Sequence, residues 1–320
     1  MYQSFLEKYR PHNFKDSLYS DEIIDMINFL TELDELNVLC FGSGETGKTT
    51  ILDIIIKNYY NVSKITNEIN QNILRINDLS DQGVQYYRNE VKTFCQIKSS
   101  IIGKKKFIIL DDIDYINEHS QQVFRNCIDK YKKNVNFIAS TSNLQKIISS
   151  LQSRTTLLFV NQFNKLKIQN KIKYIIDNEN LKLDNDAFKY VLNISYRSIK
   201  ESLNILEKLK IMDINVNIDQ IKRINTNINI DNLKEFTKMW LYDKNLKNAI
   251  NIIFNISALG YSVMDILDNY FNFIKNSTEY NEEIKNKVIK VICKYIVYFN
   301  NISEDEIELL FFTNDLFIIN

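Results

Sequence analysis

The sequence predicts an α/β module built on a parallel sheet, followed by a region made only of helices. Three observations carry this prediction. Short apolar runs alternate with helical patterns from about residue 20 to about residue 140, as strands and crossover helices do in a parallel sheet. A glycine-rich loop lies between one such strand and the helix that follows. After about residue 160 the strand patterns fade, and apolar residues recur at helical spacing.

The expected elements follow in chain order. Strands are expected over 38–41, 73–76, 107–110 and 135–140. Helices are expected over 21–33, capped by Ser20 or Asp21, and over 48–60, 84–101, 118–131, 186–195 and 284–299. The asparagine-rich stretch 213–232 is the best candidate for a linker, although isoleucine recurs in it and short helical turns remain open.

Composition narrows the class of protein. The 320 residues suggest two or three domains, and 45% hydrophobic residues suffice for a sizeable core. Lys+Arg and Asp+Glu balance at 40 each, so any nucleic acid must be bound by a local basic patch and not by an overall positive charge. Four scattered cysteines without a C-x-x-C pair argue against zinc and disulfides and favour a reducing, intracellular setting. No apolar run is long enough for a membrane span, so no membrane contact is expected.

A phosphate-binding loop is the strongest local signal. Residues 42–49, GSGETGKT, fit G-x-x-x-x-G-K-[ST] between an apolar strand and a helix. The Lys48 ammonium is expected to reach the β- and γ-phosphates, and the Thr49 hydroxyl is expected to bind Mg²⁺. The alternative is a chance turn before a helix. The candidate nucleotide-binding residues are Gly42, Ser43, Gly44, Glu45, Thr46, Gly47, Lys48, Thr49 and Thr50.

Acidic residues close the strand at 107–110. The run FIILDDID places Asp111 directly after the apolar segment, where its carboxylate is expected to hold Mg²⁺. Asp112 is the candidate that polarises the attacking water, and Asp114 is expected to cap or brace the next segment. An acidic turn without a metal is the alternative. A phosphate loop followed by such a strand is far more specific than either half.

Further motifs, in a fixed order, make the chain resemble a known family, the replication factor C small subunits. These are clamp-loading AAA+ ATPases. FLEKYRPHNF resembles the family's W-V-E-K-Y-R-P-x-x-L, and LDDID resembles L-D-E-A-D. Residues 75–94, with Asn77, Gly83, Arg88 and Phe94, are similar to N-A-S-D-E-R-G-I-x-x-V-R-x-x-I-x-x-F. Segments 152–159 (QSRTTLLF), 196–206 (YRSIKESLNIL) and NISEDEIELLFF near the end resemble the family's Q-S-R-C, G-D-M-R-x-A-L-N-x-L and last collar helix.

The resemblance implies three parts and several partners. It implies an AAA+ nucleotide-binding domain over 1–162, a helical lid over 163–226 and a helical collar over 227–320. It implies ATP held with Mg²⁺ between the subunits of a hetero-pentamer that loads a PCNA-like sliding clamp onto primer–template DNA. The place of action would be the nucleus or a viral replication compartment.

Roles for single residues also follow from the resemblance. Arg154 matches the arginine finger that acts in trans on the neighbour's ATP, with a plain surface arginine as the alternative. Tyr9 and Arg10 lie in the segment near the nucleotide base. Ser142, by spacing, or Asn143, by chemistry, would be the first sensor. Lys200 stands at the second sensor, where the family carries arginine; a solvated helix lysine is the alternative.

Three departures from the family pattern predict slow hydrolysis. Glu45 replaces a glycine, Asp112 is one methylene shorter than the family glutamate, and Lys200 is a point charge where a guanidinium fork is usual. Two other roles therefore stay open: a structural subunit that supplies Arg154 in trans, and another AAA+ machine of replication or repair.

The resemblance implies that helices of the ring contact the DNA backbone. Arg88, Lys92 and Arg125 are the candidates for these phosphate contacts, because they fall on expected helices. A solvated helix face is the alternative for each of the three.

Overall fold

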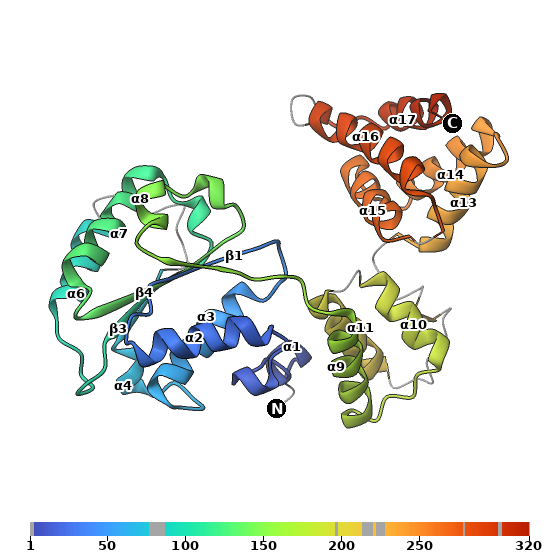
Figure 1. Cartoon of the computed structure of the whole chain (residues 1–320). Helices are drawn as coiled ribbons and strands as arrows, with labels where there is room; N and C mark the ends of the chain where they lie inside the picture. Colours follow the sequence, from blue (N-terminus) through green and yellow to red (C-terminus); the bar gives the residue numbers. More distant parts are fainter. Residues whose placement is uncertain are drawn as a thin grey trace. The chain divides into compact units, whose positions relative to one another are not determined.

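The computed structural model describes residues 3–76, 87–195, 198–212, 220–221, 228–277, 279–299 and 303–319. The chain divides into two compact units (Figure 1). The first comprises Met1–Ile175 and Ser198–Asn204, and the second comprises Ile176–Arg197 and Ile205–Asn320. The division into three parts, with boundaries after residues 162 and 226, stays a prediction. Within the described ranges, every helix is too short or too polar to span a bilayer.

A parallel sheet of five described strands organises the first unit. The order is β2-β3-β4-β1-β5, and every neighbouring pair is parallel. Val38 of β1 pairs with Ile138 of β4 on one side and with Thr156 of β5 on the other. All five strands therefore end at the same edge, where ligands bind in open α/β sheets. The strands are β1 (Val38–Phe41), β2 (Ile73–Ile76), β3 (Lys106–Leu110), β4 (Val135–Thr141) and β5 (Thr156–Phe159).

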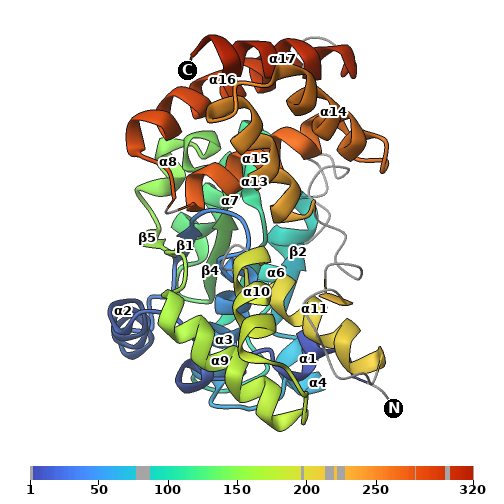
Figure 2. The ribbon, with the colours of Figure 1, turned by 90° about the vertical axis from the view of Figure 1, so that its right-hand side faces the viewer.

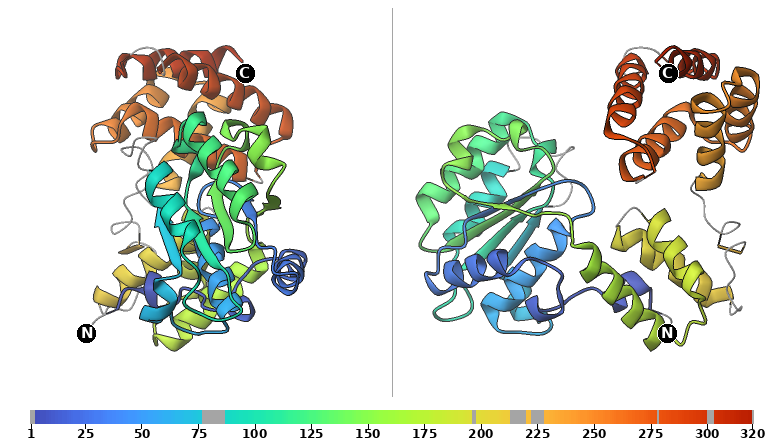
Figure 3. Two further views of the ribbon diagram at one scale, coloured as in Figure 1. Left: turned by 90° about the vertical axis from the view of Figure 1, so that its left-hand side faces the viewer. Right: turned by 45° about the vertical axis from the view of Figure 1, so that its right-hand side comes forward.

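The central strands are buried on both faces, which explains their unbroken apolar runs. Phe107 and Ile109 of β3 join a core with α2 and α3, whereas Ile108 and Leu110 join a second core with α6 and α7. Figure 3 shows helices on both sides of the sheet. This alternation follows from the two-residue period of a strand.

The helices of the first unit begin at residues suited to that position. The Asn117 side chain accepts a hydrogen bond from the Ser120 N–H and so caps α7. Asp21 and Glu22 lie in the first turn of α2, where negative charge is favoured. The helical segments are α1 (Phe5–Lys8), η1 (Phe14–Asp16), α2 (Asp21–Glu32), α3 (Lys48–Tyr60), α4 (Asn67–Asn70), η2 (Tyr87–Val91), α6 (Lys92–Gln96), η3 (Ile113–Tyr115), α7 (Glu118–Tyr131), η4 (Leu144–Lys146) and α8 (Ser149–Gln152).

The second unit is helical in its described part. The division falls within two helices, α9 (Lys165–Asn178) and α11 (Ile199–Met212), whose first residues belong to the first unit. The helices that belong to the second unit alone are α10 (Asn185–Ile194), α13 (Ile230–Leu241), α14 (Leu246–Ser257), α15 (Val263–Asn276), α16 (Glu282–Phe299) and α17 (Ile307–Ile318). A capping box between Ser262 and Asp265 begins α15. Helix α17 packs against α14 and α16 (Figure 2).

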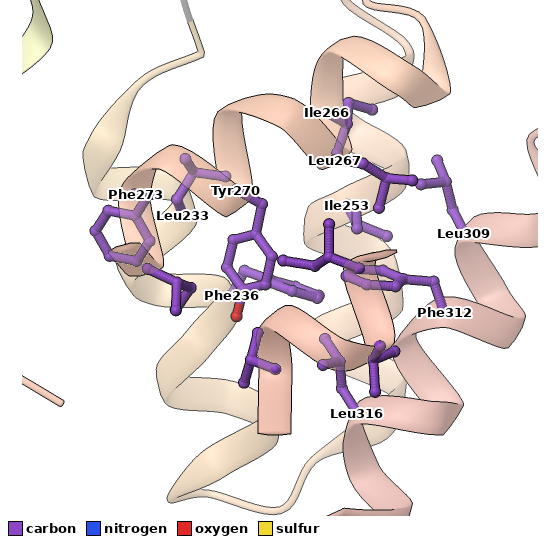
Figure 4. Close-up of a cluster of buried hydrophobic side chains, with 14 of the residues drawn as sticks. Leu233, Phe236, Ile253, Ile266, Leu267, Tyr270, Phe273, Leu309, Phe312 and Leu316 are labelled. Carbon is purple, nitrogen blue, oxygen red and sulfur yellow. The ribbon is translucent and has the colours of Figure 1, made fainter. Parts of the chain in front are cut away.

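Helices α13 to α17 share one core around Tyr270. The Tyr270 ring packs edge-on against Phe236 and Phe312, with centroids 5.3 and 6.0 Å away. Its hydroxyl accepts a hydrogen bond from Trp240 Nε1 at 3.0 Å and lies 3.1 Å from Thr237 Oγ1. Figure 4 shows Phe236, Ile253, Tyr270 and Phe312 converging from α13, α14, α15 and α17. A buried aromatic group with its polar atom satisfied is the low-energy way to fill such a core.

Most of the predicted elements are confirmed, with three differences. The helix expected over 84–101 is wrong in extent: the described part is the π-helical turn η2 followed by α6, which ends at Gln96. Strand β5 was not predicted, although it pairs with β1. The candidate linker is wrong at its end, because residues 230–232 begin α13. The motif positions Asn77 and Gly83 and most of the linker lie outside the described residues.

Candidate nucleotide site

The predicted loop lies between β1 and α3, and its backbone is tightly constrained. A Cβ on Gly42 would lie 2.4 Å from the Val160 carbonyl oxygen, which no side chain tolerates. Gly47 stands at the N-cap of α3 with φ of 83°, a left-handed conformation that favours glycine. The Thr46 hydroxyl donates to Ser43 O at 3.0 Å. Glycine is therefore required at the two positions for different reasons. At Gly42 the Val160 backbone approaches closely, and at Gly47 the backbone angle is left-handed.

Lys48 opens α3, and its side chain folds back over the loop. The buried ammonium group donates to Gly42 O at 3.1 Å and to Ser43 O at 2.8 Å. Thr49 is exposed and Thr50 is half-buried. Because the first-turn N–H groups of a helix have no partner within the helix, this end of α3 suits an anion.

Glu45 adopts a backbone conformation that favours glycine. Its φ is 60°, in the left-handed region. The side chain is exposed and lines the cavity beside the loop. Its carboxylate also helps to raise the pKa of Glu201, after the larger effect of burial, while Lys200 opposes the rise. Glu45 and the first residues of α11, Ile199 and Lys200, line the same cavity.

The acidic end of β3 lies close to the loop. Ser140 Oγ donates to Asp111 Oδ1 and accepts from the Asp112 N–H at 2.9 Å, so β4 fixes this acidic turn. Burial, then Asp111 and Asp114, raise the pKa of Asp112, and Lys48 opposes the shift. Asp112 itself has φ of 52°.

The surroundings of the Cys40 thiol link the phosphate loop to the acidic end of β3. Burial raises the pKa of this thiol to about 12; Asp111 adds to the shift and Lys48 opposes it. The strand register gives the same placement, because Cys40 pairs with Ser140 of β4, whose hydroxyl donates to Asp111.

A cavity of about 310 Å³ adjoins the loop, within the first unit. Its size and apolar walls suit a small ligand with a flat, weakly polar part. Tyr9 and Arg10 line it, as do Glu45, Gly47 and Lys200. The remaining walls come from Leu6, Pro11, Asp16, Leu18, Tyr19, Thr50, Phe163, Lys171, Ile199 and Leu203.

Arg10 is anchored through α3. Its guanidinium and that of Arg75 each donate to one oxygen of Asp53, both at 2.6 Å. Asp53 lies one turn after Thr49, so it ties the amino-terminal segment to the helix that follows the loop.

The two sensor candidates lie after β4, and both have local partners. Ser142 Oγ donates to Asp114 Oδ2 at 2.6 Å. Asn143 Oδ1 accepts from the Gln145 N–H at 3.0 Å, which caps η4. Ser142 thus contacts the acidic turn, whereas the Asn143 side chain serves the local turn. The choice between them as sensor stays a prediction.

Arg154 lies outside the cavity lining. Its Nε donates to both oxygens of Asp129, at 2.8 and 2.9 Å, and its Nη1 donates to Ser150 O at 2.8 Å. Arg125 Nε lies 3.5 Å from the same carboxylate. Among the described residues these hydrogen bonds engage Nε and Nη1 of the Arg154 guanidinium, and Nη2 remains able to donate to a partner.

Two of the three residues predicted to contact DNA line a second cavity, of about 550 Å³. Arg88 and Lys92 line it together with Lys130, and no carboxylate belongs to its described lining. We call it the basic groove; its other residues are Asn89, His119, Gln122, Val123, Asn126, Cys127 and Tyr131. Arg125 is not in this lining and instead donates to Asn126 Oδ1 at 3.0 Å.

Several residues of the site were missed by sequence reasoning. Ser140, Tyr19, Asp53 and Asp129 each hold a predicted residue in place but belong to none of the motifs. Only Ser140 gave a signal, because it lies near the carboxyl end of an apolar strand of the parallel sheet.

Comparisons with known proteins agree with this architecture. Residues 38–162 match the ATPase family associated with various cellular activities (AAA), and residues 230–297 match the replication factor C C-terminal domain. A probable replication factor C subunit 5 of Dictyostelium discoideum is 29% identical, over 84% of this chain and 78% of the relative. The replication factor C small subunit of Saccharolobus solfataricus is 25% identical, over 95% and 91%.

A solved structure supports the fold alone. RuvB of Thermotoga maritima, a Holliday junction branch migration motor, aligns with a TM-score of 0.54 and 14% identity, over 85% of this chain and 91% of RuvB.

The parallel sheet, the phosphate loop and the acidic end of β3 define an AAA+ module with a P-loop. The match to the replication factor C C-terminal domain lies in the helical second unit, and it distinguishes this chain from other AAA+ proteins. The chain belongs to the replication factor C small subunits, and its role is that of a clamp-loader subunit in DNA replication.

Proposed function

We propose that this chain binds ATP with Mg²⁺ in the loop at 42–50 and the adjoining cavity, as one subunit of a hetero-pentameric clamp loader. The observation that supports the proposal is that β4 lies between the strand before the phosphate loop and the strand that ends in Asp111: Cys40 of β1 pairs with Ser140, whose hydroxyl donates to Asp111. A cation for the phosphates and a carboxylate for the metal are the two charges that a P-loop site needs.

The donor set fits Mg²⁺. Thr49 offers a hydroxyl and Asp111 a carboxylate, and Mg²⁺ in nucleotide sites takes one or two such ligands together with phosphate oxygens and water. Within the described residues no group of three metal-ligating side chains gathers, so a cage built from protein ligands alone is not expected there. The bound ion would neutralise phosphate charge, while Lys48 and the first-turn N–H groups hold the phosphates.

Replacing Lys48 tests the site directly. Lys48→Ala should abolish ATP binding by the full chain in isothermal titration with Mg²⁺. Lys64→Ala, an exposed lysine beyond the end of α3, is the control and should bind as wild type. Unchanged ATP affinity in Lys48→Ala would rule out this loop as the phosphate site.

Arg154 is proposed to act on ATP held by the neighbouring subunit, with Asp112 polarising water in this chain's own site. A specific observation favours a second candidate, in which this subunit hydrolyses ATP weakly and mainly supplies Arg154. The observation is Glu45, whose carboxylate lines the cavity meant for a triphosphate.

Single-turnover hydrolysis in the reconstituted complex separates these roles. The complex carries Lys48→Ala, Asp112→Asn or Arg154→Ala in this subunit only. An equal loss of hydrolysis rate in all three variants would show that the nucleotide site of this subunit contributes to turnover. Loss from Arg154→Ala alone would show that it mainly serves its neighbour.

We further propose that the basic groove contacts the phosphates of primer–template DNA. Arg88, Lys92 and Lys130 supply cations without a facing carboxylate in the described lining. Arg125 is the less favoured candidate of the original three, because Asn126 and Asp129 already hold it.

The salt dependence of DNA binding tests the groove. Lys92→Gln in the complex should lower the slope of log affinity against log salt by about 1, and Lys64→Gln should leave it unchanged. An unaltered slope in Lys92→Gln would remove this residue from the interface.

The sliding clamp, a PCNA-like ring, is the proposed substrate of the assembled loader, and pull-down of the clamp by the complex tests it. The nucleus or a viral replication compartment is the proposed place of action. Relatives include a protein of Saccharomyces cerevisiae and one of Acanthamoeba polyphaga mimivirus.

A further inference from the structure

A tyrosine just before α2 contacts the phosphate loop. Tyr19 is 4% exposed, and its hydroxyl donates to the Gly47 carbonyl oxygen at 2.6 Å. The same oxygen accepts the Ile51 N–H at 3.0 Å, as the first bond of α3. Burial raises the pKa of the Tyr19 phenol, so the hydroxyl stays protonated and remains a donor. Both lone pairs of this carbonyl are therefore in use.

Holding this carbonyl also fixes the neighbouring donor. Gly47 C=O and Lys48 N–H belong to one planar trans peptide, in which the two groups point in opposite directions. The Lys48 N–H is among the first of α3 and faces the phosphate position. Gly47, like Gly42 and Gly44, has no Cβ to limit its backbone angles. The Tyr19 hydroxyl thus restrains the loop at one of its glycines.

Tyr19 also belongs to the wall of the cavity. Its ring packs against Phe163, with centroids 5.6 Å apart and planes tilted by 54°, and both residues line the cavity. A Cβ on Gly47 would lie 2.8 Å from the Tyr19 hydroxyl and 3.3 Å from Phe163. Lys167 of α9 donates to the Tyr19 carbonyl at 3.0 Å. One residue thus contacts the wall, the loop and α9.

We propose that Tyr19 is a positioning residue, which links a nucleoside seated in the cavity to the geometry of the phosphate loop through its hydrogen bond to Gly47. The inference rests on the proposed ATP site and adds a role outside the phosphate-binding motif. A nucleoside against the ring would hold Tyr19 in place, and the hydroxyl would then keep the Lys48 N–H aimed at the phosphates.

The test removes one oxygen atom and uses a matched control. Tyr19→Phe keeps the ring and loses the hydroxyl. Tyr60→Phe loses a bond of the same kind, because the Tyr60 hydroxyl donates to Lys105 O at 2.7 Å, and Tyr60 is not part of the cavity lining. ATP, ADP and adenosine are titrated against the full chain in the presence of Mg²⁺, with adenosine measured as a competitor of a fluorescent ADP analogue.

Tyr19→Phe should weaken ATP and ADP binding about 3- to 10-fold, the loss of one hydrogen bond, and should change adenosine binding less than about 2-fold. Tyr60→Phe should change none of the three. An equal loss for adenosine, or no loss for ATP, would overturn the proposal, because Tyr19 would then act only as a wall or not at all.

Amide hydrogen exchange without nucleotide gives a readout independent of ATP. Exchange in the segment 44–52 should quicken in Tyr19→Phe and stay unchanged in Tyr60→Phe. Equal exchange in both variants would count against the proposal. Failure of wild type to bind ATP would instead contradict the proposed site and leave the exchange comparison to decide the role of Tyr19.

Discussion

Replacing Glu45 with glycine should stabilise the loop. Glu45 has φ of 60°, a conformation that costs an L-residue about 1–2 kcal/mol and glycine almost nothing. Glycine has more freedom in the unfolded chain, which offsets about 0.4–1 kcal/mol. Because the Glu45 side chain is exposed, little packing is lost. The free energy of unfolding of the first unit should therefore rise by about 0–1.5 kcal/mol.

The same change should tighten ATP binding. Glu45 lines the cavity but is exposed, so its repulsion of phosphate is screened by water. Two unit charges 4 Å apart in water repel by about 1 kcal/mol. Removing the carboxylate should therefore strengthen ATP binding about 2- to 5-fold.

Glu45→Gln separates the two effects, because it keeps the left-handed backbone and removes only the charge. Urea unfolding followed by circular dichroism reports stability, and calorimetric titration with Mg²⁺ and ATP reports affinity. The glycine variant should gain in both measurements, and the glutamine variant in affinity alone. A glutamine variant that binds ATP no more tightly than wild type would refute the electrostatic part. A glycine variant no more stable than wild type would refute the conformational part.

Three further predictions concern stability, pH and turnover. Tyr270→Phe removes the oxygen that accepts from Trp240 Nε1 in the core of the second unit, while Thr237 keeps its bond to Leu233 O. The free energy of unfolding should fall by about 1–3 kcal/mol, measured by urea unfolding and the fluorescence of the only tryptophan in the sequence. Burial and Glu45 raise the pKa of Glu201, so the ionised carboxylate lowers the stability of the fold above that pKa. Glu201→Gln should therefore raise the melting temperature at pH 7.5, and the difference from wild type should shrink as the pH falls through the raised pKa. A difference that stays constant with pH would argue against this. The isolated chain should hydrolyse ATP slowly, because arginine fingers contribute roughly 10³–10⁵-fold and Arg154 would serve a neighbour; robust phosphate release by the chain alone would contradict this.

The sequence predicted well those features that depend on short-range chemistry. The run VLCFGSGETGKTT indicated a strand, a loop and a helix because glycine spacing and apolar periodicity are local properties, and β1 and α3 follow it residue by residue. FIILDD predicted β3 and its acidic end in the same way. The parallel sheet followed from the alternation of strands and helices.

Contacts between distant segments could not be predicted in this way. Tyr19 bonds to Gly47 across 28 residues, and Ser140 bonds to Asp111 across 29. Tyr19 carries no local signal of this role, and Ser140 shows only its position near the carboxyl end of a strand. Strand β5 was missed for a related reason: it lies at the edge of the sheet, and Leu157 and Phe159 are exposed. Its pattern therefore lacks the continuous burial that identifies the central strands.

We expect the departures from the family pattern to act on separable steps, which bears on the two proposed roles. Glu45 should affect how tightly a triphosphate binds, because its side chain lines the cavity. Asp112 is proposed to act on the attacking water in this chain's own site. Arg154 takes no part in the cavity lining, and Asp129 holds its Nε independently of the loop. The chain could therefore lose its own hydrolysis while its service to a neighbouring subunit stays intact. A loader that tolerates Lys48→Ala in this subunit but not Arg154→Ala would be the expected result of such a division.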